Sequence, residues 1–506
     1  MRLRHRLVHS IPASLLFVLP LAFGLAGLRV TAQETLLTKP AVVPTNAGAP
    51  FTPPGSLPGN RPYPFDLPTA LRLAQAESLD VALAAQRIRI AVAQLDRAKV
   101  LWLPTIVWGG DYFRHDGQLQ DIVGNVFGTS RSTVMAGAGP IMVFAATDAI
   151  FEPLAARQTL RAQEAGLRAV ANDTTLAVAE AYFNVQQARG ELAGAEDAVR
   201  RAEDIVGRAE KLAGELVPRL ELARTRAELA RRRQTVHSTR ERWRVASTEL
   251  VRILRLDPVL LVDPVEPPSL EIPLVPTEQC VDDLIVQALG ARPELTAQQA
   301  LVQATIRRLK QERLRPLVPS VLLRGAATNP AGTLSSGFFA GGVNGRIADS
   351  GARNTMDVQL LWELQNLGFG NRARVNVRRA EHDTAILELF RTQDAIAAEV
   401  VRAHAQVQES AARITEAAAG LRDAVESATQ NVEGMSQTKK AGNVVLLVIR
   451  PQEAVAAVQA LGQAYADYYG AVADFNRAQF RLYRALGNPA AALGAESASP
   501  CPAEKQ

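Results

Sequence analysis

The feature of this sequence that most constrains its fold is the length of its helical patterns. Two of the predicted helices are about 65 to 71 residues long, and at a rise of about 1.5 Å per residue they span about 98 and 106 Å. The two shorter helices that flank each of them add up to about 90 and 100 Å. Each long helix can therefore be matched by two short ones stacked end to end, which predicts a rod rather than a globule. The predicted helices are 79–101, 149–213, 219–255, 284–314, 371–441 and 451–486.

Apolar side chains on these helices recur at alternating gaps of three and four. An average spacing of 3.5 residues drives a left-handed coiled coil, and alanine at alternate seam positions lets helices approach closely. The first seam contains Val185, Ala188, Leu192, Ala195, Val199, Ala202, Val206 and Ala209, and the second contains Leu461, Ala464, Tyr468, Ala471, Phe475, Ala478 and Leu482.

The last helix carries part of a second stripe, at Tyr465, Tyr469 and Val472. A helix with two apolar stripes needs a neighbour on each side, as in a wall of helices. The alternative is an ordinary antiparallel coiled coil with one broad apolar face.

The chain contains two similar halves in the same order, each reading helix, two strands, very long helix, helix. Several weak matches that occur in the same order are stronger evidence of an internal repeat than any single match. The matching segments are 78–81 with 292–295, 102–105 with 317–320, 211–214 with 439–442, and 254–258 with 486–489.

We therefore divide the sequence into six parts, with the strands of the two repeats near 104–114 and 131–143, and near 319–327 and 354–365. Nine prolines in residues 33–68 and six in residues 258–278 predict extended segments. The parts are an export signal (1–32), a Pro-rich arm (33–68), repeat 1 (69–257), a Pro-rich linker (258–278), repeat 2 (279–489) and a C-terminal tail (490–506).

The N-terminus has the three-part pattern of a secretory signal peptide. Arg2, Arg4 and Arg6 precede an apolar run over 11–28, and Ala32 ends a small-residue cleavage site. An uncleaved anchor helix is the alternative. Gln33 follows the predicted cut, so we expect no lipid attachment there. Without the signal the formal charge falls from +5 to about +1, which gives no electrostatic case for nucleic-acid binding.

The strand predicted over 354–365 alternates between apolar and mostly polar residues, which is typical of a strand between lipid and a watery lumen. The alternative is a half-buried strand of a soluble sheet. On the membrane reading, Val358, Leu360 and Trp362 face lipid, and Asp357, Gln359 and Glu363 line a pore. The first two strands alternate poorly, and Trp102, Trp108 and Tyr112 are either interface aromatics or packing residues.

Four strands cannot close a barrel, for which about eight is the smallest workable number. An open sheet edge in lipid would leave its amides without partners. If these strands cross a membrane, two or three copies of the chain must therefore pool them.

These patterns resemble the TolC-like outer-membrane efflux proteins over residues 65–490. The resemblance is carried by the Phe-Asp-Leu-Pro-Thr-Ala-Leu opening at 65–71, by Leu103-Pro104, by Glu180-Ala181-Tyr182 and by the run at 362–370. It implies a homotrimer with a shared transmembrane β-barrel and a periplasmic α-barrel in the outer membrane. It also implies a periplasmic adaptor (a membrane fusion protein) and an inner-membrane pump as partners.

In that family the turn after each long helix forms a periplasmic tip that the adaptor touches, and Gly214 and Gly442 stand there. Glycine also caps a helix in the left-handed conformation. The family's acidic pore residues correspond to Leu220 and Val448, so we consider Glu221 and Glu453 as substitutes.

The sequence shows no sign of an enzyme. It lacks a His-Glu-x-x-His pair, a Gly-x-Ser-x-Gly elbow and a phosphate-binding loop, and its two cysteines cannot form a disulfide framework or a zinc ribbon. A loose dinucleotide-like run at 368–373 opens a helix too long for a Rossmann unit. We expect no cofactor and no metal.

Two functions from different classes fit these observations. The first is a passive exit duct of a tripartite efflux or type I secretion system, driven by the inner-membrane pump. The second is a soluble periplasmic coiled-coil scaffold or adaptor, which shares the signal and the heptads but needs no lipid-facing strand.

Overall fold

The computed structural model describes residues 62–487 apart from 215, 326–335 and 442–443, all within one compact unit, Phe51–Gln506. The expected export signal (1–32), most of the Pro-rich arm and the tail (490–506) lie outside the described residues.

The described chain is mainly helical, with a smaller β part, as the sequence predicts. The helices are α1 (Leu67–Glu77), α2 (Leu79–Lys99), α3 (Ala146–Lys211), α4 (Arg219–Leu254), α5 (Val281–Ala291), α6 (Pro293–Leu314), the short 3-10 helix η1 (Gln365–Gly368), α7 (Phe369–Gly434) and α8 (Pro451–Ala485). The strands are β1 (Pro62–Phe65), β2 (Thr105–Gln120), β3 (Val126–Ala145), β4 (Leu261–Pro264), β5 (Ser320–Arg324), β6 (Gly337–Val343), β7 (Asp349–Arg353), β8 (Asp357–Leu361), β9 (Thr438–Ala441) and β10 (Val444–Leu447).

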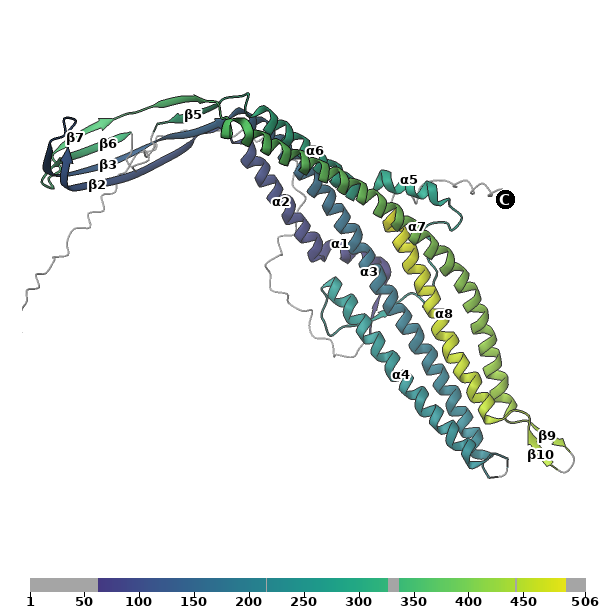
Figure 1. The fold of residues 1–506 in the computed structure, drawn as a ribbon. Coiled ribbons are helices and arrows are strands. Elements are labelled where there is room, and N and C mark those ends of the chain that lie inside the picture. Colours follow the sequence, from purple (N-terminus) through teal and green to yellow (C-terminus); the bar gives the residue numbers. More distant parts are fainter. Residues whose placement is uncertain (1–61, 215, 326–335, 442–443, 488–506) are drawn as a thin grey trace, which may run out of the picture. The chain divides into compact units, whose positions relative to one another are not determined.

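The two long helices, α3 and α7, each contain 66 residues and span about 99 Å. Helix α3 packs against α2 and α4, and α7 packs against α6 and α8. Helices α6 and α8 also pack against α3 and lie between the two long helices, and Figure 1 shows the short helices following one another along the long ones. The structure therefore places two short helices end to end along each long helix, as their lengths predict.

The helix predicted over 284–314 is wrong in its middle, where the chain breaks between α5 and α6. Proline has no N–H and disfavours helical geometry in the residue before it, so Pro293 holds Arg292 in an extended conformation, with φ −67° and ψ 122°. The Arg292 side chain is only 4% exposed and donates to the carbonyl of Ala485 (3.1 Å) and to Glu399 (3.0 Å). The break thus lets one guanidinium tie the end of α8 to α7.

The helix predicted over 371–441 is also wrong at its end, because α7 stops at Gly434. A Cβ at this position would lie 2.5 Å from the Ile449 side chain, so the chain can close tightly there only with glycine. The next residues form the β9–β10 hairpin instead of another helical turn.

The predicted coiled-coil seams lie in the protein core. The first seam is buried except for half-buried Val199, and in the second seam only Ala464 and Tyr468 are half-buried. Helix α8 packs against both α7 and α3, so its two apolar stripes do have a neighbour on each side.

Two glycines bring α8 close to α3. A Cβ on Gly190 would lie 2.7 Å from the ring of Tyr469, and a Cβ on Gly194 would lie 2.6 Å from Tyr465. The two tyrosine rings stack in parallel, with 6.3 Å between their centroids. The small residues of α3 therefore form the groove into which the tyrosine stripe of α8 fits.

The end of the Pro-rich arm meets the linker beside α3. Strand β1 pairs in parallel with β4, and the hydroxyl of Tyr182 donates to the carbonyl of Phe65 (3.1 Å) and to Glu266. Trp243 of α4 donates its indole N–H to the carbonyl of Val262 at 2.8 Å. These contacts give the two extended segments defined partners on α3 and α4.

None of the helices in the described part of the chain combines the length and the apolar content that a membrane-spanning helix needs.

Two glycine-to-alanine variants of α3 test the close approach of α3 and α8. Gly194→Ala puts a methyl group into Tyr465 and should destabilise the fold by about 1–3 kcal/mol through overpacking. Gly207→Ala is the matched control, because nothing lies within 4 Å of its Cβ position, and it should stabilise the helix by about 0.5–1 kcal/mol. Thermal unfolding followed by circular dichroism measures both. Equal midpoints for the two variants would contradict the packing described.

Candidate functional site: a two-faced sheet and two helix tips

The main sheet is built from six strands but is four strands wide, both next to the helices and farther away from them. Strand β3 pairs with β2 along one edge, and its other edge pairs with β5 over 141–145 and with β6 over 131–136. Strands β8 and β7 then pair with β5 and β6. Strands β6 and β7 therefore continue the paths of β5 and β8 away from the helices. Neither strand was predicted from the sequence, in which the strands of the second repeat were placed near 319–327 and 354–365.

The strand register assigns every side chain to one of two faces, because residues directly opposite each other in an antiparallel pair share a face. One face, which we call the apolar face, is built almost entirely from apolar side chains between the helices and the middle of β2. On β3 it runs from Val134 to Phe144, and these 11 residues match the 9–11 that a strand needs to cross a bilayer. Its members include Ile106, Trp108, Tyr112, Val134, Ala136, Ala138, Pro140, Met142, Phe144, Val321, Leu323, Phe338, Ala340, Ala352, Val358 and Leu360.

The largest side chains of the apolar face are open to the surroundings of the chain. Trp108 is 82% exposed, Phe338 is 76% exposed, and Val358 and Leu360 are each 59% exposed. An exposed apolar surface of this size marks a contact with lipid or with another protein.

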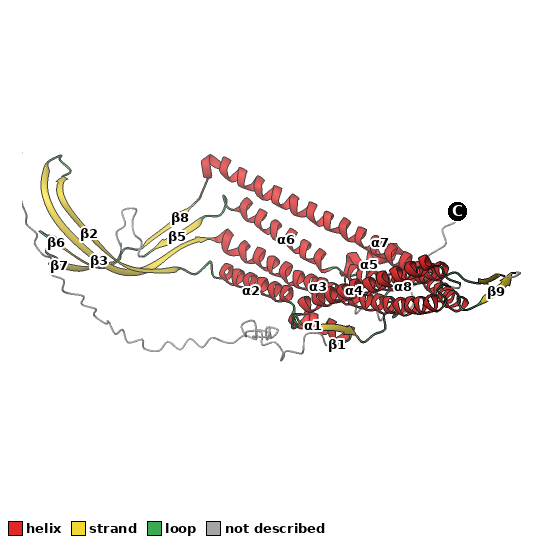
Figure 2. Ribbon diagram, turned by 90° about the horizontal axis from the view of Figure 1, so that it is seen from below, coloured by secondary structure: helices red, strands yellow, loops and turns green. Residues whose placement is uncertain are grey.

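The opposite face, which we call the polar face, mixes apolar residues such as buried Met135 with charged and polar ones. Arg324 stands directly across from Asp357, and Gln359 follows on the same face. Figure 2 shows the sheet curving along its strands. The polar members include Thr105, Asp111, His115, Thr129, Arg131, Thr133, Ser320, Arg324, Asp349, Arg353, Asp357 and Gln359.

The structure thus puts Val358 and Leu360 on the opposite face from Asp357 and Gln359. Trp362 and Glu363 lie beyond the end of β8, in the turn toward α7. Glu363 there accepts a hydrogen bond from the Gln365 amide at 2.6 Å. The register therefore assigns a face to four of the six residues.

Both outer edges of the sheet are unpaired within the described residues. The outer edge of β2 and the outer edges of β7 and β8 have no strand beside them in the described part of the chain. Each edge is a row of backbone N–H and C=O groups that needs a partner or water.

At the other end of the helices, the α3–α4 connection forms the first tip, residues 212–218. Gly214 has φ +93°, a left-handed conformation that favours glycine, and its N–H donates to the carbonyl of Val217 at 3.2 Å. Gly214 therefore shapes the turn of the tip, whereas the C-cap of α3 is Leu212, and contact of Gly214 with an adaptor stays a prediction.

The second tip, residues 435–450, contains the β9–β10 hairpin, which projects past the ends of α7 and α8 (Figure 1). Gly442 lies outside the described residues. In the sequence, Gly442-Asn443 is a pair typical of two-residue hairpin loops, and this signal would have predicted the hairpin.

The two carboxylates considered for the tips both have local partners. Glu221 pairs with Arg224 at 3.2 Å, and Glu453 accepts the Arg450 N–H at 3.4 Å as part of the α8 capping box. Leu220 and Val448 are exposed. In the single chain, the tips therefore present apolar side chains where the family carries acidic ones.

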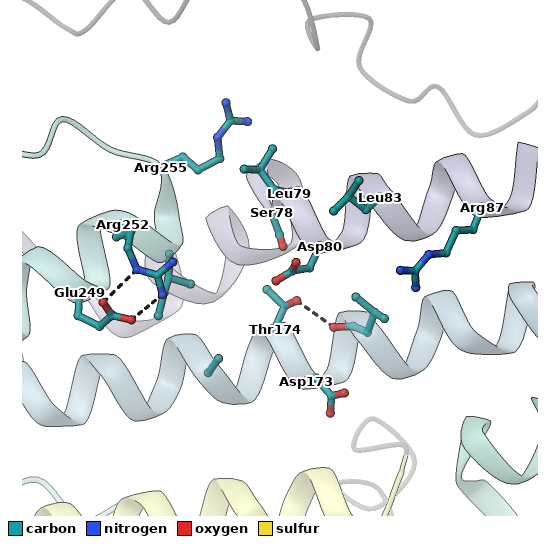
Figure 3. A pocket seen from close by; sticks show the side chains of 13 residues that line it. Ser78, Leu79, Asp80, Leu83, Arg87, Asp173, Thr174, Glu249, Arg252 and Arg255 are labelled. Carbon is teal, nitrogen blue, oxygen red and sulfur yellow. Dashed lines mark hydrogen bonds and ion pairs between the residues drawn. The ribbon is translucent and has the colours of Figure 1, made fainter.

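A pocket of about 610 Å³ lies where α2 and α4 meet on α3 (Figure 3). Ser78 accepts the Val81 N–H there to cap α2, and Glu249 pairs with Arg252 at 2.6 Å. The pocket marks the joint between the two stacked short helices. Within the described residues, no group of three or more His, Cys, Asp or Glu side chains could hold a metal ion.

Comparison with known proteins agrees with the family resemblance seen in the sequence. Residues 70–254 match the family model described as "Outer membrane efflux protein". The resemblance to that family is confirmed. The CmeC outer membrane channel from Campylobacter jejuni superimposes on this chain with a TM-score of 0.67 at 16% identity, covering 83% of this chain and 85% of that one.

Two more outer-membrane proteins match over similar lengths. The open state of the Neisseria gonorrhoeae MtrE outer membrane channel gives a TM-score of 0.63 at 16% identity, over 84% of this chain and 89% of that one. The outer membrane protein VceC from Vibrio cholerae also gives 0.63 at 16%, over 83% and 96%. No curated protein matches by sequence. The chain therefore has the fold of the TolC-like channels.

Within this efflux-protein fold, Asp197 links α3 to α8 between the tyrosine groove and the tips. Its carboxylate accepts hydrogen bonds from Arg201 (2.9 Å) and from the hydroxyl of Tyr465 (3.2 Å). Burial acts to raise the pKa of Asp197, but these hydrogen bonds and the charge of Arg200 outweigh it and hold the pKa below its ordinary value.

Replacing Asp197 by Asn should therefore change the pH dependence of stability. A carboxyl with a lowered pKa contributes stability that is fully present above its unfolded pKa of about 3.9 and is lost as the pH falls through the folded value. We expect the thermal midpoint of Asp197→Asn to lie below that of the parent at neutral pH, and the gap to shrink below about pH 4. Asp204→Asn, at an exposed position of α3, is the control and should show no such gap. A gap for Asp197→Asn that stays constant with pH would contradict this role.

Proposed function

We propose that this chain is the protomer of a passive exit duct in the outer membrane. Three copies would place their four-strand-wide sheets side by side as a transmembrane barrel, with the helices forming a channel in the periplasm. The observation that carries the proposal is the two-faced sheet, whose apolar face is long enough to cross a bilayer and whose two edges are open.

The open edges determine how many copies of the chain a closed barrel needs. In the hydrocarbon core there is no water to satisfy the backbone groups of β2 and β8, so only closure of the ring removes their cost. One sheet is too narrow, because about eight strands are the fewest that close. Three sheets of four give 12 strands, which agrees with the homotrimer that the family resemblance implies.

The polar face then supplies the lining of the duct. Arg324, Asp357 and Gln359 would face the lumen, while Val358 and Leu360 would face acyl chains. Such a wall offers water and charged side chains to a passing solute, and no step of bond making or breaking is proposed for it.

The energy for transport would come from elsewhere in the assembly. An inner-membrane pump would drive export, and a periplasmic adaptor would join the pump to the tips around Gly214 and the second tip. This is supported by the similarity to channels described as outer-membrane proteins, and by the position of the tips at the end of the helices far from the sheet.

Substitutions at neighbouring positions of β8 test the proposal. Leu360→Arg places a charge on the apolar face, where it should cost about 2–4 kcal/mol near the bilayer midplane and reduce the amount of channel assembled. Gln359→Arg, one residue away on the polar face, should assemble normally and change only the ion selectivity. Outer-membrane yield and stepwise conductance in planar bilayers measure the two effects.

The opposite result would favour a soluble scaffold. Such a protein would tolerate both arginines equally, would leave the periplasm on osmotic shock, and would give no conductance.

A further inference from the structure

The two helix tips differ in length, and the second tip is longer than a reversal of the chain requires. The first connection reverses direction in the seven residues 212–218, whereas the second uses the sixteen residues 435–450. The additional length forms the β9–β10 hairpin, which projects beyond the helix ends in both views (Figures 1 and 2). A hairpin of two short strands is marginally stable by itself, so the extra residues need another reason.

The register identifies which backbone groups of the hairpin point outward. The N–H of Val448 donates to the carbonyl of Gln437 at 3.0 Å, which makes this a hydrogen-bonded pair. Hydrogen-bonded and non-hydrogen-bonded pairs alternate along an antiparallel ladder. The pairs Leu447↔Thr438 and Val445↔Lys440 are therefore non-hydrogen-bonded, and their N–H and C=O groups face away from the hairpin.

The two outer edges differ in their protection. Strand β9 contains Lys439, which is exposed, and a second lysine, and lysine is a residue that natural sheets use to blunt an edge. Strand β10 reads Val-Val-Leu-Leu and contains neither charge nor proline. An uncharged apolar edge of this kind is a template for strand addition.

The charge of the second tip indicates which kind of strand would pair with the edge of β10. Between Glu433 and Glu453 the sequence contains Lys439, Lys440 and Arg450 and no acidic residue, a net charge of +3. Two such hairpins from neighbouring copies would repel each other, whereas a segment with acidic side chains would be attracted.

We propose that the free edge of β10 binds a partner protein by strand addition, and that the added segment alternates apolar with acidic residues. The hairpin would become a three-stranded sheet, with the outward N–H groups of Val445 and Leu447 donating to the partner's backbone. The proposal rests on the proposed function only in placing this partner within the export assembly. It adds a binding mode at the second tip that the first tip has no strand to provide.

A matched pair of proline substitutions tests the edge. Proline is tolerated where an edge N–H faces solvent, so the hairpin should survive both Val445→Pro on β10 and Thr438→Pro on β9. The probe is a fluorescent synthetic peptide of alternating valine and glutamate, and fluorescence anisotropy measures its affinity for the detergent-purified full chain. We expect Val445→Pro to weaken binding by about ten-fold, and Thr438→Pro to change it by less than about two-fold.

A charge reversal tests the electrostatic part. Lys439→Glu should weaken the binding of the valine–glutamate peptide and strengthen that of a valine–lysine peptide. Lys211→Glu, at an exposed position by the first tip, is the control and should do neither.

Three results would overturn the proposal: no binding of the peptide to the parent chain, a larger loss from Thr438→Pro than from Val445→Pro, or equal losses from both. Loss of oligomer assembly in Val445→Pro would instead assign the edge to a second copy, against the proposal. Single-channel conductance, measured in the same variants, separates this inference from the proposed function. A chain that conducts but does not bind the peptide refutes only the strand addition, and a chain that binds but never conducts refutes only the duct.

Discussion

The hydrogen-bonding requirement of the peptide backbone at the edges of the sheet governs the rest of this structure. Within the described residues, strands β2 and β8 end the sheet with open rows of N–H and C=O groups, and large apolar side chains such as Trp108 and Leu360 are exposed on them. In water such edges could be solvated, but in a bilayer they must pair. The proposed sharing of strands among copies follows from this requirement and from the width of the sheet.

The helices pack closely because small side chains on α3 make room for large ones on α8. Gly190 and Gly194 let the tyrosines of α8 enter a groove on α3, and Asp197 joins the two helices below that groove. Each long helix packs against short helices that follow one another along it, so that the helices form a wall. A wall of this kind suits a channel.

The sequence allowed much of the fold to be predicted, because heptad spacing and helix length are local patterns. The buried seams and the two-sided packing of α8 followed from these patterns. The split at Pro293 and the hairpin after Gly434 did not, although proline and the Gly442-Asn443 pair were visible signals. Assigning faces in β2 and β3 needed the strand register, since their own alternation is poor. The residues of the tips and of the lumen depend on contacts between copies, and a single sequence does not contain these.

The mass of the detergent-extracted particle tests the central claim most directly. If copies close one sheet by pooling their edges, native mass spectrometry of protein extracted from outer membranes will show three chains, with no monomer at low detergent. A chain recovered without detergent as a freely dissolved monomer would contradict the account, because its apolar face and open edges would then be stable in water.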